Sequence, residues 1–121
     1  MNSEIAKSWI LMHRAKSGSH DYEDNFWAFA KLYSLCDEVP DQGFAIIEEI
    51  MRIDSSDIIL ANIAAGPMES LLAQHGQKFI DKIEQLAAAD SQFRKMLGAM
   101  WQHNIEENIW TRVKRVAGPT F

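Results

Sequence analysis

Hydrophobic residues recur every three or four positions along most of the chain, a spacing that places them on one side of an α-helix. Ile5, Trp9 and Met12 follow this spacing in a first helix, which should end near the turn-like residues 17–19. A second helix is predicted to begin near Asp21. We expect its apolar side to be buried, and this stripe comprises Tyr22, Phe26, Phe29, Tyr33 and Cys36.

Prolines and glycines divide the rest of the chain into further helices. Pro40 fits the first turn of a third helix that reaches Ile53. Gly66 and Pro67 should separate two short helices, and Gly76 should end the second of them. The predicted ranges beyond Ile53 are 57–65, 68–74, 77–89, about 91–101 and about 105–116. No alternating strand pattern is present, so the predicted fold is all-α, a compact bundle or a short solenoid-like stack of about seven to eight short helices.

Length and composition fit one domain, residues 1–121, because 47% of the residues are hydrophobic and can supply a core. No apolar run approaches the roughly 18 residues of a membrane span. The first residues lack the pattern of a cleaved signal, and Cys36 has no second cysteine to pair with. These features lead us to expect a cytoplasmic protein without membrane contact.

The segment from Ile63 to Trp101 resembles a bacterial family catalogued as domain of unknown function 6869. Members of that family are similar to GPLEDLLxxHG followed by F-I-D and F-R-x-x-L-x-x-x-W. The matching residues here are Gly66, Pro67, Glu69, Leu71, Leu72, His75, Gly76, Phe79, Ile80, Asp81, Phe93, Arg94, Leu97 and Trp101, with Trp110, Arg112 and Val113 as a trailing W-x-R-V. Met68 and Ser70 depart from it. The resemblance covers residues 40–116 and implies a helical fold, but it implies no reaction.

Histidine offers the main candidate chemistry. His75 has Glu69 and Asp81 six residues away on either side, which suggests a small enzyme or ligand binder as an alternative function. A histidine in the last turn of a helix is also favoured by the helix dipole and by free carbonyl groups, and we prefer this structural role. The other histidines follow no metal-binding spacing, so we expect neither a catalytic site nor a metal site.

Cysteine, glycine and tryptophan give no stronger signal. Cys36 lies on a predicted apolar stripe, where burial would disfavour its thiolate. The glycines do not form a phosphate-binding motif, so no nucleotide cofactor is expected. The four tryptophans could stack on nucleic-acid bases, but they lie on or near apolar stripes and we expect core packing instead: Trp9, Trp27, Trp101 and Trp110.

Negative charge is concentrated in one third of the chain. Residues 21–57 hold ten of the 17 acidic residues and only two of the 12 basic residues. These acids lie at predicted helix ends and on polar sides, where they would either only aid solubility or form a surface that repels nucleic acid and attracts basic proteins. The predicted partner-binding residues are Glu23, Asp24, Trp27, Asp37, Glu38, Asp41, Glu48 and Glu49.

These observations favour a protein-interaction module without enzymatic activity. A small acidic helical protein can block a phosphate-binding active site by offering carboxylates in place of phosphates. We therefore expect an immunity-type inhibitor that neutralises a basic toxin domain, such as a bacterial nuclease. The alternatives are the small enzyme or ligand binder around His75 and a homo-oligomeric scaffold, for instance a homodimer.

Overall fold

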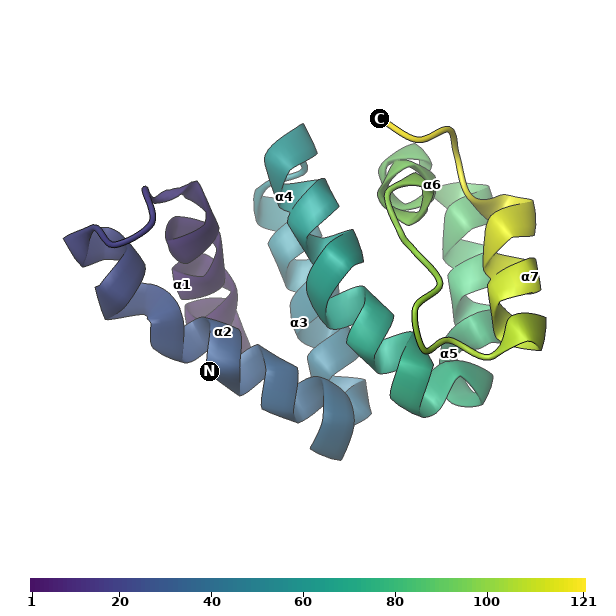
Figure 1. Ribbon diagram of the computed structural model, residues 1–121, viewed down its shortest axis with the longest axis horizontal. Coiled ribbons are helices and arrows are strands. Elements are labelled where there is room, and N and C mark those ends of the chain that lie inside the picture. Colours follow the sequence, from purple (N-terminus) through teal and green to yellow (C-terminus); the bar gives the residue numbers. More distant parts are fainter.

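Seven α-helices and one π-helical segment make up the molecule, and the computed structural model describes all 121 residues (Figure 1). No strand is present, so the all-α prediction is confirmed. The elements are α1 (Asn2–Arg14), α2 (His20–Glu38), α3 (Pro40–Ile53), α4 (Asp57–Ile63), η1 (Ala64–Met68), α5 (Glu69–Ala89), α6 (Ser91–Gly98) and α7 (Glu107–Val116). Since α4, η1 and α5 follow one another without a break, the chain forms six continuous helical units rather than the predicted seven to eight.

The helices form two groups on either side of the unit that runs from α4 through α5. Figure 1 shows α1 and α2 at one end of the molecule and α6 and α7 at the other, with α3 behind α4, and α3 packs mainly against α1 and α2. One cluster of 30 buried residues takes members from all seven α-helices, among them Trp9, Phe44 and Phe79. Hydrophobic burial therefore joins both groups into one core. None of the helices combines the length and the hydrophobicity that crossing a membrane requires.

The predicted break at Gly66 and Pro67 is wrong. The chain instead passes through both residues as the π-helical segment η1 and continues directly into α5. In an ordinary α-helix the ring of Pro67 would clash with the carbonyl group of Ile63, four residues earlier. A π-helical turn is wider, and it accommodates the proline without ending the helix. Glycine and proline here mark a local widening of the helix.

The predicted helix boundary beside Gly76 is present as a kink within α5, which nevertheless continues to Ala89. The helix is kinked at His75, whose φ of −136° and ψ of 32° are not helical. A Cβ atom on Gly76 would lie 3.1 Å from the side chain of Ile109 in α7. The glycine therefore serves the close packing of α5 against α7, which the sequence pattern alone does not reveal.

The prediction that the aromatic side of α2 is buried is also wrong, except for Cys36. Tyr33 is 60% exposed and Phe26 43% exposed, while Tyr22 and Phe29 are half-buried. We call these four residues the α2 aromatic stripe. The residues of α2 that face the core are Ala28, Leu32, Leu35 and Cys36.

A close helix crossing explains this rotation of α2. A Cβ atom on Gly43 of α3 would lie only 3.0 Å from the Cα, N and Sγ atoms of Cys36 in α2. Small side chains permit this approach, whereas the rings of the stripe are too large to lie in the crossing. The α2 aromatic stripe consequently lies on the flank of the helix.

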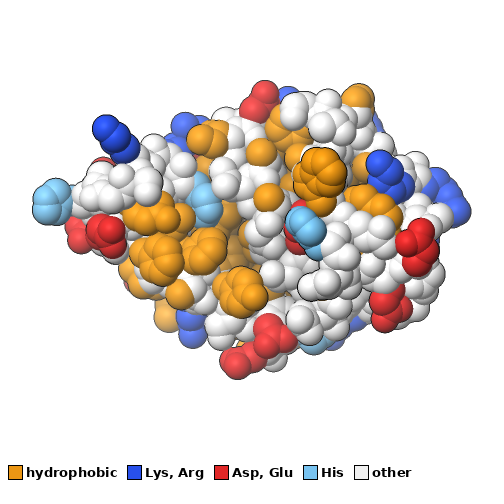
Figure 2. All heavy atoms as spheres, viewed as in Figure 1, with side chains coloured by type: hydrophobic (Ala, Val, Ile, Leu, Met, Phe, Trp, Pro, Cys, Tyr) orange, Lys and Arg blue, Asp and Glu red, His pale blue; other side chains and the backbone are white.

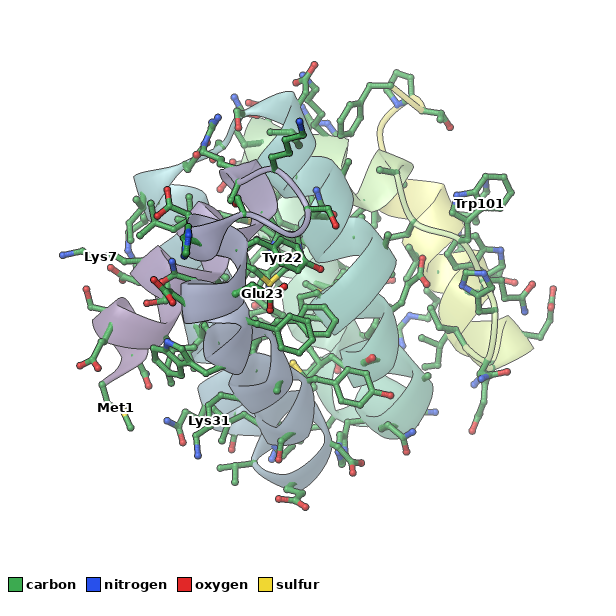
Figure 3. All side chains as sticks on the ribbon, turned by 60° about the vertical axis from the view of Figure 1, so that its left-hand side comes forward. Met1, Lys7, Tyr22, Glu23, Lys31 and Trp101 are labelled. Atoms are coloured by element: carbon green, nitrogen blue, oxygen red, sulfur yellow. The ribbon has the colours of Figure 1, made fainter.

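The four tryptophans differ in how deeply they are buried. Trp9 is buried and Trp110 is half-buried, as core packing requires. Trp27 is 42% exposed and Trp101 is 69% exposed, so the core prediction is wrong for both. Trp101 lies beyond the end of α6, in the loop that leads to α7, and projects outward from it (Figure 3).

Candidate functional site: an aromatic cleft beside the second helix

Aromatic rings form a connected row from the interior to the surface. The ring of Trp9 lies 3.8 Å from that of His13, which lies 6.1 Å from Phe29 (centroid distances). The row continues along α2 from Phe29 to Phe26 at 5.4 Å and from Phe26 to Tyr22 at 6.0 Å. Figure 3 shows ring side chains on the side of α2 that faces α4 and α5. The stripe is thus the outer part of a larger aromatic assembly.

A cleft of about 310 Å³ opens beside this row, and we call it the aromatic cleft. Figure 2 shows hydrophobic side chains gathered over α2 next to a hollow. One wall belongs to α1 and α2 and comprises Trp9, His13, Phe29, Leu32 and Tyr33. The other wall belongs to α4, η1 and α5 and comprises Asn62, Ala65, Gly66, Pro67, Glu69 and Ser70. The π-helical turn therefore shapes one side of the cleft, and such turns are frequent at functional sites.

Glu69 contributes a nearly buried carboxylate to the cleft. The residue is only 8% exposed, and its Oε2 accepts a hydrogen bond from the backbone N–H of Trp101 at 3.0 Å. Its Oε1 accepts one from Nδ1 of His103 at 2.7 Å. His103 has a φ of 42°, in the left-handed region that non-glycine residues rarely adopt. Glu69 therefore holds the α6–α7 loop, including the exposed Trp101, against the start of α5.

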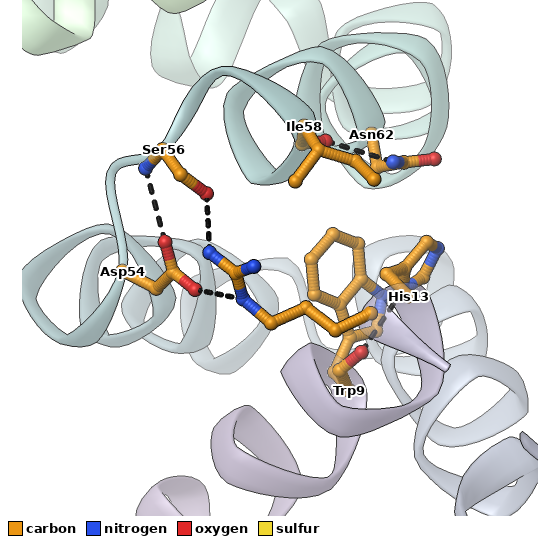
Figure 4. Close-up of polar contacts among 7 residues, drawn as sticks. Trp9, His13, Asp54, Ser56, Ile58 and Asn62 are labelled. Atoms are coloured by element: carbon orange, nitrogen blue, oxygen red, sulfur yellow. Dashed lines mark hydrogen bonds and ion pairs between the residues drawn. The ribbon is translucent and has the colours of Figure 1, made fainter. Parts of the chain in front are cut away.

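His13 and Asn62 have their donor groups directed at backbone carbonyls (Figure 4). Nδ1 of His13 lies 3.0 Å from the carbonyl oxygen of Trp9, and Nδ2 of Asn62 donates to that of Ile58 at 2.8 Å. Burial lowers the pKa of His13 and so favours the neutral imidazole. Because Nδ1 must carry the proton for this bond, Nε2 of His13 remains an acceptor. The amide oxygen of Asn62 also remains an acceptor.

An ion pair fixes the end of α1 that carries His13. Nε of Arg14 donates to Asp54 at 2.6 Å, and its guanidinium also donates to Oγ of Ser56 at 2.8 Å (Figure 4). Hydrogen bonding to Arg14 holds the pKa of Asp54 well below its usual range. These contacts tie α1 to the segment between α3 and α4, so the two walls of the cleft keep their spacing.

The predicted partner-binding residues fall into two sets. Glu23 and Asp24 lie near the start of α2 and Asp37 and Glu38 at its end, all exposed and without an ion-pair partner. Figure 2 shows acidic side chains at both ends of the hydrophobic cluster over α2. Trp27 lies on the same helix and is exposed. This first set therefore lies on the same helix as the α2 aromatic stripe, at its two ends and beside it.

The second set lies on α3 and is paired with basic residues. Asp41 lies 3.2 Å from Nζ of Lys78, and Glu48 lies 3.5 Å from Nζ of Lys82. Glu49 pairs with Arg52, one turn further along α3. The structure therefore does not bring all seven acids into one uncompensated surface: four lie on α2 without partners and three lie on α3 with them.

His75, Glu69 and Asp81 are directed to three different places. Nε2 of His75 donates to the carbonyl oxygen of Asp37 at 2.6 Å, so it binds the end of α2. Asp81 pairs with Arg112 at 2.6 Å, and Glu69 binds the α6–α7 loop as described. No two of the three share a hydrogen bond or an ion pair. The alternative site around His75 is thus not assembled, and His75 binds a carbonyl group of another helix rather than of its own.

Cys36 and the other candidate ligands offer no further site. Cys36 is fully buried, as expected, and burial raises the pKa of its thiol to about 12. No group of three or more histidine, cysteine or acidic side chains is placed to hold a metal ion.

Sequence reasoning missed the aromatic cleft. The sequence shows His13 and Glu69 as polar residues of two helices, but not that they line opposite walls of one cleft, because those helices are distant in the sequence. One signal was available: four of the five residues on the apolar side predicted for the second helix are aromatic, and large rings are enriched at binding surfaces as well as in cores.

Comparison with known proteins gives a family without a described activity. The model of the family of unknown function DUF6869 matches residues 15–120, more of the chain than the motif-bearing segment from Pro40 to Val116. No curated protein and no solved structure matches the chain. The match includes α2, α3 and both walls of the cleft except Trp9 and His13. The chain belongs to the DUF6869 family.

Proposed function

We propose that this chain is a protein-interaction module that binds a basic protein partner through α2. The observation that carries the proposal is the combination of an uncovered aromatic stripe with four acids that lack cation partners at the two ends of the same helix. The proposed biological form is an immunity-type inhibitor in the bacterial cytoplasm, which masks a toxin domain whose active site holds phosphate groups.

Aromatic side chains suit the centre of such an interface. Tyrosine and tryptophan bury large areas while losing little side-chain entropy, and they are enriched among the residues that dominate binding energy. Tyr33 and Phe26 are exposed in the free chain, so binding would remove their apolar surface from water. The stripe would therefore supply affinity.

The acids at the ends of α2 suit the rim. Carboxylates there attract a basic partner during diffusion and set its orientation, while the apolar centre excludes water. Glu23 and Asp24 would meet one part of the partner, and Asp37 and Glu38 another, because they lie at opposite ends of a 19-residue helix. Asp41, Glu48 and Glu49 contribute less in this proposal, since Lys78, Lys82 and Arg52 already compensate them.

The test is a binding measurement with a candidate partner, the purified product of a neighbouring gene that encodes a basic protein. A stoichiometric complex is expected on size-exclusion chromatography, and it should weaken as salt rises. The variant Phe26→Ala/Tyr33→Ala should lower the affinity about 100-fold, because it removes two side chains that would contribute strongly to binding. A matched control is Leu11→Ala/Ile53→Ala, which also removes two exposed apolar side chains, from α1 and α3. It should leave the affinity within about twofold of the parent value.

Two outcomes would count against the proposal. If both double variants lose affinity equally, α2 has no special role. If the chain alone forms a dimer that the Phe26→Ala/Tyr33→Ala variant abolishes, the stripe is covered by a second copy, and the scaffold interpretation replaces the inhibitor.

A further inference from the structure

We infer that the aromatic cleft receives the cationic head of an arginine or lysine side chain from the basic partner. The inference rests on the proposed function and deepens it, because it names the chemical group that the site recognises. The cleft adjoins the α2 aromatic stripe through Phe29 and Tyr33, which belong to both. A partner that covers the stripe would therefore lie directly over the cleft.

The walls of the cleft favour a cation. Phe29 and Tyr33 present accessible aromatic rings beside the buried Trp9, and a cation over a ring face is stabilised by the negative charge of the π system. No lysine or arginine lines the cleft to repel it. An aliphatic stem, as in lysine or arginine, would also find apolar contacts with Leu32 and Pro67.

The fixed polar atoms of the cleft favour a hydrogen-bond donor. Nε2 of His13 and the amide oxygen of Asn62 are acceptors, because the donor groups of both side chains are already directed at backbone carbonyls. Glu69 adds a carboxylate. A guanidinium or ammonium group carries only donors, so it complements these acceptors, whereas a phosphate or carboxylate would face them unfavourably.

Glu69 keeps acceptor capacity for such a ligand. A carboxylate offers about four acceptor positions, and its two intramolecular bonds come from Trp101 and His103. A tenth of its side-chain surface remains accessible. Because the group is otherwise buried, a charge-assisted bond to it would be stronger than one at the open surface.

The size of the cleft fits one side chain. Its volume of about 310 Å³ is at the lower end of the range for small-molecule sites. A whole helix or strand of a partner would not enter it. The stripe outside the cleft would meet the rest of the partner's surface.

The first experiment uses the full chain labelled with 5-fluorotryptophan and followed by ¹⁹F NMR. N-acetyl-arginine amide is the probe, and the matching citrulline amide, which is nearly isosteric but neutral, is the control. The Trp9 resonance should shift and saturate with the arginine probe, while the Trp110 resonance stays in place. The citrulline probe should bind at least about tenfold more weakly, the expected effect of losing one charge-assisted hydrogen bond. No saturable shift, or equal binding of both probes, overturns the inference.

The second experiment uses two tyrosine variants that separate the cleft from the stripe. Tyr33→Leu removes a ring from the wall of the cleft, whereas Tyr22→Leu removes a ring of the stripe that does not line it. Probe binding should fall about threefold to tenfold for Tyr33→Leu and stay unchanged for Tyr22→Leu. Equal behaviour of the two variants overturns the assignment of the site.

The third experiment tests Glu69 with the intact partner. Glu69→Gln keeps the shape of the side chain but removes its charge, and partner affinity should fall about tenfold. The thermal unfolding midpoint is measured in parallel, and a variant that does not fold is replaced by the Tyr33→Leu comparison. If Phe26→Ala/Tyr33→Ala abolishes the complex while Glu69→Gln leaves its affinity unchanged, the cleft inference fails and the proposed function stands. If the arginine probe binds but no α2 variant affects the partner, the proposed function fails and the cleft is a site for free organic cations, which also overturns the inference.

Discussion

The neighbouring helices α2 and α3 carry similar patterns and have opposite environments. Both have an apolar stripe at helical spacing and several acidic residues. On α3 the stripe is sealed in the core, with Phe44, Ile47 and Ile50 almost completely buried. On α2 the rings of Phe26 and Tyr33 remain exposed, because the core takes a different side of the helix.

The acids of the two helices differ in the same way. Those of α3 are paired with cations, for example Asp41 with Lys78, while those at the ends of α2 have no such partner. An amphipathic pattern predicts a helix and an apolar side, but it does not tell which apolar sides the fold covers. The uncovered one is the best candidate for a binding surface.

The largest predicted difference concerns the stripes themselves. Phe44→Ala should lower the free energy of unfolding by about 3–5 kcal/mol, because it removes a buried ring that stacks on Phe79. Phe26→Ala should lower it by less than about 1.5 kcal/mol, since much of that ring is already in water. Urea denaturation followed by circular dichroism measures both. Similar losses for the two variants would mean that Phe26 is part of the core.

The next prediction concerns the crossing that rotates α2 away from its aromatic side. Gly43→Ala places a methyl group about 3.0 Å from the backbone of Cys36 and should destabilise the chain by about 1–3 kcal/mol. Gly66→Ala is the control, because a Cβ atom there meets no atom within 4 Å. Because residue 66 lies inside a helical segment, Gly66→Ala should leave the free energy of unfolding unchanged or raise it by up to about 1 kcal/mol. A harmless Gly43→Ala would show that the crossing is looser than described.

A smaller effect is expected when the charges of the two helices are reversed separately. Glu23→Lys/Asp24→Lys and Glu48→Lys/Glu49→Lys change the net charge by the same amount. The α2 variant should slow association with the basic partner by about tenfold at low salt, because it removes uncompensated charge that steers the partner. The α3 variant should slow it less, and high salt should reduce the difference. Stopped-flow mixing measures the rates, and an equal or larger effect of the α3 variant would shift the interface to α3.

The smallest effect is a pH dependence from His13 in the cleft. Burial lowers the pKa of His13 in the folded chain, so the unfolded chain binds more protons as the pH falls below about 6.5. Stability should therefore decrease from pH 7 toward pH 5, and His13→Gln should make this decrease shallower. Thermal unfolding at several pH values measures it. A steeper decrease in the variant would mean that the protonated form of His13 is stabilised by folding.

The helices, most of their ends and the burial of Cys36 were predictable from local patterns. The helix predicted to begin near residue 91, for example, does so as α6, and the carboxylate of Asp90 caps it by accepting from the N–H groups of Gln92 and Phe93. The passage through Gly66 and Pro67 was not predictable, because a π-helical turn has the same local residues as a break. The role of Gly76 was hidden for a different reason, since its contact is with Ile109, far along the chain.

The candidate site was predicted in part. The exposure of the acids on α2 follows from helix position, but the cation partners of Asp41 and Glu48 come from α5 and depend on tertiary packing. The cleft depends on the same packing, because its two walls are separated in sequence by α3. Local periodicity in the sequence therefore predicts neither the ion pairs between α3 and α5 nor the cleft.

Hydrogen–deuterium exchange of the chain, free and bound to its basic partner, tests most directly whether the uncovered side of α2 is the binding surface. Binding should slow exchange in residues 20–38 and around 62–70, while the α3 residues 41–52 exchange as in the free chain. Slower exchange in α3 with no change in α2 would contradict it.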